Sequence, residues 1–222
     1  MGEILSFKDL DYFYEGRGKR VDILNQASYG FEKGKLYTIL GPSGSGKTTT
    51  LALAAALDAP RSGEVLFGDQ SLKKIGFTKY RSSKIGIVFQ SYNLLSYMNA
   101  LQNVMMVMEI SGNKVKNPKE RGYQLLEKVG INRDMAGRNI NKLSGGEQQR
   151  VAIARAISTD AELILADEPT GNLDVKTAEE IIKIFLNLAH DEGKCVIAVT
   201  HSVEFSEQAD VVIRLEDGKL VS

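Results

Sequence analysis

Residues 41–48 have the composition of a loop that binds phosphate. They match the pattern G-x-x-x-x-G-K-[ST] between an apolar run and a segment rich in Ala and Leu. Glycines let backbone N–H groups surround an anion, and the start of the following helix adds unpaired N–H groups and a partial positive charge. Lys47 is expected to reach the β- and γ-phosphates, and the Thr48 hydroxyl to bind Mg²⁺. The residues expected to contact a nucleotide here are Gly41, Pro42, Ser43, Gly44, Ser45, Gly46, Lys47, Thr48 and Thr49.

Taken alone, this motif indicates nucleotide binding and no more, because many unrelated NTPases contain it. The alternative is a glycine turn before an ordinary amphipathic helix. The complete motif in a strand–loop–helix context disfavours that alternative.

Two adjacent acids, Asp167 and Glu168, end a strand-like apolar run at residues 163–166. Carboxylates are costly to bury without a cation, and the carboxyl end of a strand in a parallel sheet faces the crevice where ligands bind. We expect Asp167 to hold Mg²⁺, usually through water, and Glu168 to act as the general base that polarises the attacking water. The alternative is an acidic pair at the start of a solvated loop. It is disfavoured because residues 169–171 turn the chain immediately afterwards.

A second helix start suited to an anion lies at residues 143–148, with the sequence LSGGEQ. Ser144 is the expected N-cap, and two glycine N–H groups follow it. The helix expected at residues 149–157 is apolar nearly all round after Arg150, which is typical of a buried helix. One chain that binds one nucleotide does not need two such termini. The second terminus could instead bind a nucleotide held by a second copy of the chain.

The composition limits the classes of protein to which the chain can belong. Hydrophobic residues make up 43% and charged residues 25%, and Lys+Arg and Asp+Glu are both 28, so the formal net charge is zero. This balance argues against a nucleic-acid-coating protein, and we expect no nucleic-acid partner. The longest apolar stretch, residues 51–57, is far shorter than the roughly 20 residues of a membrane span. Cys195 is the single cysteine, which fits a reducing compartment and a cytoplasmic location.

Alternating strand-like and helical segments must position these residues. Strands are expected at residues 4–10 (an edge strand), 37–40, 65–67, 85–89, 163–165, 195–199 and 211–215. Helices are expected at residues 47–57, 94–110, 122–129, 149–157 and 175–191. This order predicts a mostly parallel sheet covered on both faces, with a mostly helical insertion over residues 91–156.

Over essentially its whole length the chain resembles the ABC ATPase family. The resemblance implies a single α/β domain over residues 1–222: a P-loop NTPase core with a mostly parallel sheet, an N-terminal antiparallel β part and an inserted helical subdomain. The nucleotide-binding core would comprise residues 1–90 and 157–222. The helical subdomain would comprise residues 91–156 and carry the sequence LSGGE, which resembles the family signature.

The resemblance also implies roles for single residues. Gln90 resembles the Q-loop glutamine, which senses Mg²⁺ and couples to a transmembrane partner, so the expected metal ligands are Thr48, Gln90 and Asp167. Asp174 belongs to a segment similar to the D-loop at the dimer interface. His201 resembles the switch histidine that contacts the γ-phosphate, and the catalytic set would be Glu168, His201 and Lys47. The signature residues expected to contact the partner's ATP are Ser144, Gly145, Gly146 and Glu147.

Adenine would stack on an aromatic residue near the N-terminus. Tyr14 matches the family position, with Tyr12 as a near competitor in the run Tyr12-Phe13-Tyr14. The sequence leaves this choice open.

The implied mechanism needs two copies of the chain. They would pair head to tail, with each ATP between Lys47 and Thr48 of one copy and Ser144 and Gly146 of the other. Hydrolysis would remove the γ-phosphate that both copies hold, and the pair would reopen.

Residues 88–95 and 167–174 are similar to the ATPases of the macrolide-exporter and lipoprotein-releasing group, to which antimicrobial-peptide resistance transporters are close. The implied partners are a second copy of the chain and an integral membrane permease, with an extracytoplasmic accessory protein as a further partner. The implied location is the cytoplasmic face of the cell membrane. The chain departs from the usual pattern at Ser96-Tyr97, where proline often follows two leucines, and at Ser202, where an acid commonly follows the histidine.

Two alternatives stay open. One is an ABC ATPase that regulates a cell-wall enzyme through a membrane partner without transport. The other is a soluble ABC ATPase that acts on DNA or ribosomes; the chain shows no long coiled-coil insertion, zinc-binding cysteines or second cassette to favour it. Met98, Met105, Met106 and Met108 could line a groove for the permease's cytoplasmic helix or fill the core.

Overall fold

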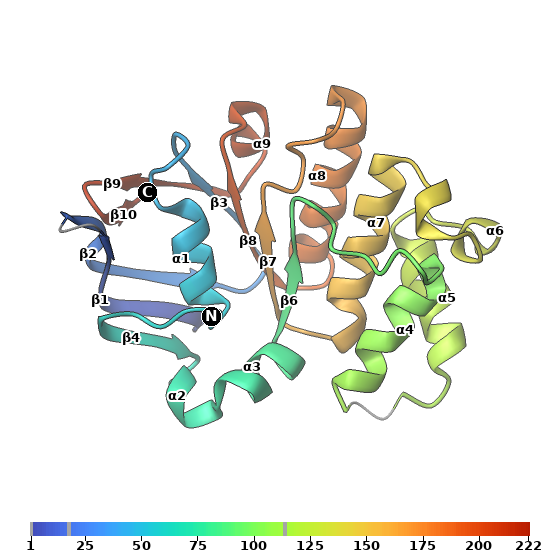
Figure 1. The fold of residues 1–222 in the computed structure, drawn as a ribbon, viewed down its shortest axis with the longest axis horizontal. Coiled ribbons are helices and arrows are strands. Elements are labelled where there is room, and N and C mark those ends of the chain that lie inside the picture. Colours follow the sequence, from blue (N-terminus) through green and yellow to red (C-terminus); the bar gives the residue numbers. More distant parts are fainter. Residues whose placement is uncertain (1, 17–18, 113–114) are drawn as a thin grey trace.

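The computed structural model describes residues 2–16, 19–112 and 115–222, which fold into two β-sheets and two groups of helices (Figure 1). One sheet has the strand order β2-β1-β4-β5 and is antiparallel, and the other has the order β10-β9-β3-β8-β7-β6. Strands β9, β3, β8, β7 and β6 run parallel, and β10 pairs antiparallel with β9.

The bounds of the strands are β1 (Glu3–Gly16), β2 (Lys19–Glu32), β3 (Leu36–Leu40), β4 (Ser62–Phe67), β5 (Gln70–Ser71), β6 (Ile85–Val88), β7 (Leu163–Asp167), β8 (Cys195–Thr200), β9 (Val211–Glu216) and β10 (Lys219–Val221). The bounds of the helices are α1 (Lys47–Ala54), α2 (Leu72–Ile75), α3 (Phe77–Ser83), α4 (Ala100–Ile110), α5 (Pro118–Lys128), α6 (Arg133–Ala136), α7 (Gly145–Ala156), α8 (Val175–His190) and α9 (Val203–Glu207). Two 3₁₀ turns, η1 (Ile140–Lys142) and η2 (Ile157–Thr159), flank α7.

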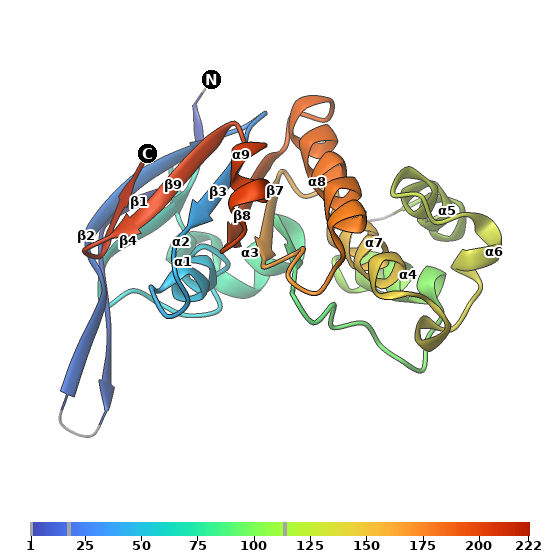
Figure 2. The same ribbon diagram turned by 90° about the horizontal axis from the view of Figure 1, so that it is seen from above.

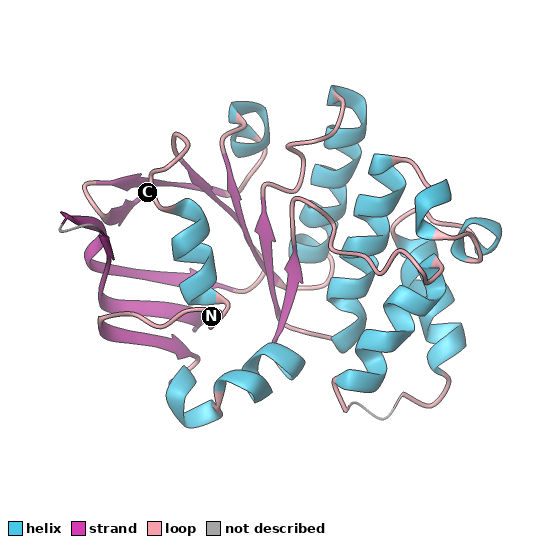
Figure 3. Ribbon diagram, viewed as in Figure 1, coloured by secondary structure: helices cyan, strands magenta, loops and turns pink. Residues whose placement is uncertain are grey.

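Alternate residues of the parallel strands enter two separate hydrophobic cores. In β7, Leu163 and Leu165 pack in one core with α1 and the antiparallel sheet, whereas Ile164 and Ala166 pack in the other with α7 and α8. Both faces of the sheet are therefore covered, as the run of apolar residues predicts. Figures 2 and 3 show α1 between the two sheets and α8 on the opposite face of the parallel sheet.

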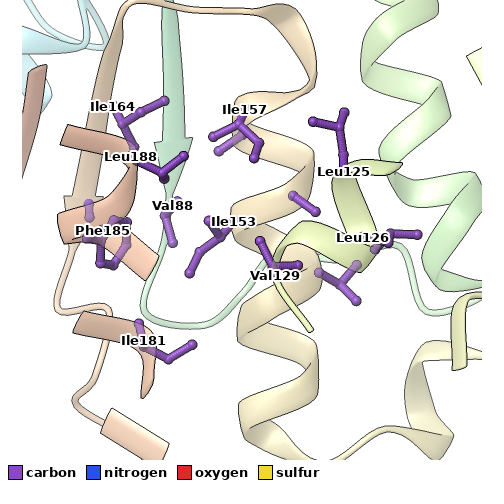
Figure 4. Packing of buried hydrophobic residues seen from close by; sticks show 14 of the residues in the cluster. Val88, Leu125, Leu126, Val129, Ile153, Ile157, Ile164, Ile181, Phe185 and Leu188 are labelled. Atoms are coloured by element: carbon purple, nitrogen blue, oxygen red, sulfur yellow. The ribbon is translucent and has the colours of Figure 1, made fainter. Parts of the chain in front are cut away.

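The second core extends away from the sheet into a cluster of helices (Figure 4). Ile153 of α7, Phe185 of α8 and the residue after α5, Val129, converge there, and all are buried. Helix α7 contacts both β6 and α8 and also packs on α4 and α5. The helix that begins at the LSGGE segment therefore joins the helical part of the chain to the sheet.

The expected fold class is confirmed, but several elements and bounds differ from those expected; for example, helices α2, α3 and α9 were not expected, and α5 begins at Pro118 rather than at residue 122. Residues 4–10 are not an edge strand, because β1 lies between β2 and β4 and continues to Gly16. The expected N-terminal antiparallel part is present, but strand β2 was not among the expected strands, because register shifts such as the one between Phe7 and Leu10 break the alternation of the pair. The helix expected from residue 94 begins only at Ala100, where Asn99 and Gln102 form a capping box.

Among the described residues, no helix combines the length and apolarity needed to cross a membrane. The division of the chain at residues 90 and 157 into core and helical subdomain stays a prediction.

Candidate functional site

A pocket of about 640 Å³ opens at the carboxyl ends of the parallel strands, beside the start of α1. Parallel α/β sheets bind ligands at this edge. Its lining comes from segments far apart in the chain: Tyr14, Ile23, Ser43, Gly44, Gly46, Lys47, Thr48, Thr49, Gln90, Glu168 and His201. The structure therefore brings most of the expected cis residues into one cavity.

The loop before α1 is shaped for an anion. Gly44 and Gly46 have φ values of 81° and 101°, a left-handed conformation that suits glycine. A Cβ on Gly46 would lie 2.4 Å from Cγ2 of Ile23, so no larger residue fits there without a shift. Gly46 is also the N-cap of α1 and makes no side-chain capping hydrogen bond, which leaves the first N–H groups of the helix without such an acceptor.

Two further features of this loop fit a phosphate group. The Oγ of Ser45 is buried and has no hydrogen-bond partner among the described residues. A buried hydroxyl without a partner is unfavourable, and a phosphate oxygen would satisfy it. The Nζ of Lys47 donates to the carbonyl oxygens of Gly41 and Pro42 at 2.8 and 2.9 Å. An ammonium group has three hydrogens, so the third can meet a phosphate oxygen.

Thr48, Asp167 and Gln90 supply oxygen atoms of the kind that Mg²⁺ binds. The Oγ1 of Thr48 lies 3.4 Å from Oδ1 of Asp167, and Gln90 lines the same pocket. Burial raises the pKa of Asp167 above its usual value, and the neighbouring Glu168 raises it further, against the opposite effects of Thr48 and Lys47. A divalent cation would offset this cost of burial, and Mg²⁺ commonly uses few protein ligands together with substrate phosphates. The residues present therefore fit the ion.

Glu168 and His201 form a pair at the mouth of the pocket. Nδ1 of His201 lies 2.9 Å from Oε1 of Glu168, and the backbone N–H of His201 donates to Oε2 at 3.3 Å. The side chain of His201 is 64% exposed and that of Glu168 only 15%. The carboxylate is thus held in one orientation while the imidazole stays open to a ligand.

The structure separates the two tyrosines that the sequence left open. Tyr14 is 48% exposed, lines the pocket and places its hydroxyl 3.0 Å from Oγ1 of Thr49. Tyr12 is 2% exposed and donates its hydroxyl to Asp58. Of these two rings, that of Tyr14 is therefore the one available to a ligand base. Ile23 is a lining residue that sequence reasoning missed, because strand β2 was not recognised.

The residues expected to act in trans lie outside this pocket. The Oγ of Ser144 accepts from the N–H of Glu147, whose carboxylate accepts from the N–H of Ser144, so the two form a capping box at the start of α7. A Cβ on Gly146 would lie 2.4 Å from Cγ2 of Thr177, so close packing of α7 on α8 requires a glycine there. Asp174 caps α8 by accepting hydrogen bonds from the N–H and hydroxyl of Thr177.

Known proteins resemble this chain over nearly its full length. Residues 24–171 match the family described as ABC transporter. The ABC transporter ATP-binding protein YclH of Bacillus subtilis is 48% identical, over 97% of this chain and 94% of its own length. LolD of Idiomarina loihiensis, the ATP-binding protein of a lipoprotein-releasing system, is 38% identical, over 98% of this chain and 96% of its own length.

Two solved structures are similar to this chain over nearly its full length. The dimeric structure of MJ0796, a bacterial ABC transporter cassette, has a TM-score of 0.88 and 34% identity and covers 98% of this chain and 97% of its own. A dimeric post-hydrolysis state of the same cassette, bound to ADP and Pi, has a TM-score of 0.88 and 33% identity, with the same coverage.

Proposed function

Because this chain belongs to the ABC transporter family, we propose that two copies of it close around two ATP molecules and reopen after hydrolysis, and so drive a membrane permease. The chain is the ATP-binding subunit of such a transporter, and it is an ATPase. The observation that carries the proposal is the position of Ser144 and Gly145. They are exposed at the start of α7 and lie outside the pocket that holds the other expected nucleotide contacts.

Each nucleotide site is completed by the second copy. Lys47, the N–H groups at the start of α1 and the hydroxyl of Ser45 bind the phosphates, and Tyr14 stacks on the adenine. Thr48, Gln90 and Asp167 would hold Mg²⁺, which would supply charge neutralisation at the phosphate oxygens. The signature residues of the partner copy cap the γ-phosphate with Ser144, Gly145, Gly146 and Glu147, and Asp174 lies at the interface between the copies.

This arrangement couples hydrolysis to motion. Each charge-assisted hydrogen bond contributes about 1.5–3 kcal/mol. Several such bonds over two sites exceed the roughly 5.5 kcal/mol that inverts an open–closed equilibrium. Glu168 polarises the water that attacks the γ-phosphate, and His201 holds the carboxylate and contacts the γ-phosphate. Once that phosphate leaves, the bonds that bridge the copies are lost and the dimer reopens.

A groove between the sheet and the helical cluster offers the permease a binding surface. It measures about 320 Å³ and lies beside the strand that precedes Gln90. Its lining is Arg81, Ser82, Ile85, Gly86, Ile87, Phe89, Asn93, Met106, Val107, Ile110, Ser111, Arg155, Ala156 and Thr159.

Three of the four methionines considered divide between the two roles, whereas Met98 is half-buried and belongs to neither the core cluster nor the groove. Met108 is buried in the core, and Met105 packs against it. Met106 lines the groove, next to Ile110, which is 70% exposed. We propose that a cytoplasmic helix of the permease contacts the groove at Met106, since methionine adapts to irregular apolar surfaces.

The similarity to LolD supports a transporter of the macrolide-exporter, lipoprotein-releasing or antimicrobial-peptide resistance type. In this proposal the subunit is bound to the cytoplasmic face of the cell membrane through its permease. An extracytoplasmic accessory protein completes the complex.

Affinity isolation tests the partner. Tagged Glu168→Gln is captured from detergent-solubilised membranes of the source cells, with and without ATP, and the bound proteins are identified by mass spectrometry. We expect recovery of a permease with a large extracytoplasmic domain, and the identities of the co-isolated proteins would point to the substrate. Recovery of a membrane protein together with a cell-wall hydrolase would support the regulatory alternative. Recovery of only ribosomal or DNA-bound proteins would contradict the transporter assignment and leave the ATPase assignment in place.

A further inference from the structure

A buried hydrogen bond ties the helix of the signature segment to the loop of the general base. Gln149 lies in the second turn of α7, and its side chain is fully buried. Its Nε2 donates to the carbonyl oxygen of Pro169 at 2.8 Å. Pro169 directly follows Glu168, so this bond acts on the residue next to the base.

Glu168 has a backbone conformation that needs support. Its φ is 43°, in the left-handed region that is unfavourable for residues other than glycine, asparagine and aspartate. Such a conformation persists where the surroundings impose it. The N–H of Glu168 donates to the carbonyl of Val199 at 2.9 Å, and its carbonyl accepts from the N–H of Gly171 at 3.1 Å. Gln149 fixes the next carbonyl along the chain, that of Pro169.

The buried amide of Gln149 is not explained by packing alone. Its Oε1 has no hydrogen-bond partner among the described residues. An unpaired buried oxygen is unfavourable, so an apolar side chain of similar size would suit a packing role better. The single donor bond to Pro169 is therefore the feature that distinguishes glutamine from methionine at this position.

We propose that Gln149 is a positioning residue for hydrolysis, which holds Glu168 in its reactive orientation through the Pro169 carbonyl. The inference rests on the proposed role of Glu168 as the general base. The bond also links two sites of one chain, because α7 begins at the residues that face the partner's ATP, whereas Glu168 serves the chain's own ATP. A small displacement of a catalytic group is enough to slow a reaction by about 10²-fold.

A pair of matched glutamine substitutions tests the role. Gln149→Met removes the donor at similar volume, and we expect kcat to fall by about 10- to 100-fold with KM and Kd for ATP changed less than about threefold. Gln208→Met is the control, because Nε2 of Gln208 donates to the carbonyl of Glu204 in α9, outside both the Glu168 loop and the signature segment. Its kcat should stay within about threefold of the unmodified protein. A normal kcat in Gln149→Met would overturn the inference.

A pH profile distinguishes a positioning role of Gln149 from a packing role. In Gln149→Glu the new carboxyl is buried, which raises its pKa, and only the protonated form can donate to the Pro169 carbonyl. We therefore expect kcat of Gln149→Glu, relative to that of the unmodified protein, to rise as the pH falls from about 8 to 6. A ratio that is constant over this range would contradict the donor role.

Combination with a change at the base shows whether Gln149 acts through it. In Glu168→Gln, the added change Gln149→Met should lower the residual single-turnover rate by less than about threefold. A reduction equal to that in the unmodified protein would show that Gln149 acts independently of Glu168. If Glu168→Gln itself turns over normally, the proposed role of Glu168 as the general base fails too. If only Gln149→Met is normal, this inference alone fails.

Discussion

Both carboxylate oxygens of Glu168 are engaged by a single residue, His201. Nδ1 of the imidazole lies 2.9 Å from Oε1, and the backbone N–H of His201 donates to Oε2 at 3.3 Å. The pair joins the ends of β7 and β8, two neighbouring parallel strands. His201 therefore fixes the orientation of the proposed base while its own ring stays exposed to the pocket.

His201→Ala tests this relationship. We expect kcat to fall by about 10²-fold, because the carboxylate loses its orienting partner and the γ-phosphate loses a contact, while Kd for ATP changes little. Steady-state ATPase assays and nucleotide titration measure the two effects. The control is His190→Ala. His190 is the last residue of α8, contacts Asp210 and lies outside the pocket. Equal losses in both variants would show that the effect is not specific to the site.

Asp167→Asn should make the nucleotide-free protein more stable at neutral pH but reduce its ATPase activity. Because burial raises the pKa of Asp167, the folded state binds more protons than the unfolded state at pH values just above about 3.9. The contribution of this group to the free energy of unfolding is therefore largest below that window and is lost as the pH rises through the folded pKa. At neutral pH the neutral asparagine should raise the Tm of the nucleotide-free protein by roughly 1–3 °C.

The same substitution should remove Mg²⁺-dependent turnover, because a proposed ligand of the ion is lost. Thermal unfolding of the nucleotide-free protein measures the change in Tm. ATPase assays over a range of Mg²⁺ concentrations measure the loss of turnover. A Tm that falls at neutral pH would contradict the burial argument, and unchanged dependence on Mg²⁺ would remove Asp167 from the metal site.

Tyr14→Ala should weaken ATP binding, since the exposed ring at the pocket is the proposed adenine platform. Base stacking on an aromatic ring contributes about 1–3 kcal/mol, so Kd is expected to rise by roughly 5- to 150-fold. Tyr12→Phe is the matched control. It removes only the hydroxyl that bonds Asp58, and it should lower the free energy of unfolding by about 1 kcal/mol with Kd unchanged. Fluorescent-nucleotide titration measures Kd in both variants, and an unchanged Kd in Tyr14→Ala would remove Tyr14 as the proposed adenine platform.

Ser144→Arg should leave ATP binding intact in the monomer and abolish hydrolysis. Ser144 lies outside the pocket of its own chain, so the bulky cation would block only the approach of a second copy. Nucleotide titration, sedimentation and ATPase assays measure binding, association and turnover. Normal ATPase activity in this variant would argue against a shared site.

Much of this site could be predicted because its residues follow apolar strands that meet at one edge of a parallel sheet. Lys47 and His201 follow such strands and Asp167 ends one, and the alternation of strand-like and helical segments indicates parallel pairing without knowledge of the tertiary structure. The phosphate loop is a local motif, so its conformation is encoded in consecutive residues.

Features that depend on packing between distant segments could not be predicted. Register shifts in the β1–β2 pair obscure the alternating pattern, so β2 and with it Ile23 were missed. The apolar spacing of residues 94–99 suggested a helix, but the buried side chain of Asn103 bonds both backbone groups of Leu95 and holds this segment as a loop. The bond from Gln149 to Pro169 depends on how α7 packs against the loop after β7, which no local pattern shows.

The most direct test of the shared site is the ATP-dependent association of Glu168→Gln. Loss of the proposed general base should slow turnover by about 10²–10⁴-fold, so we expect ATP to persist between the two copies and hold them together. Light scattering after size-exclusion chromatography, with and without ATP, measures the mass. We expect a stable dimer with ATP, a monomer without it, and no dimer when Ser144→Arg is added. A variant that turns over rapidly would remove Glu168 as the base, and one that binds ATP but stays monomeric would contradict the shared nucleotide site.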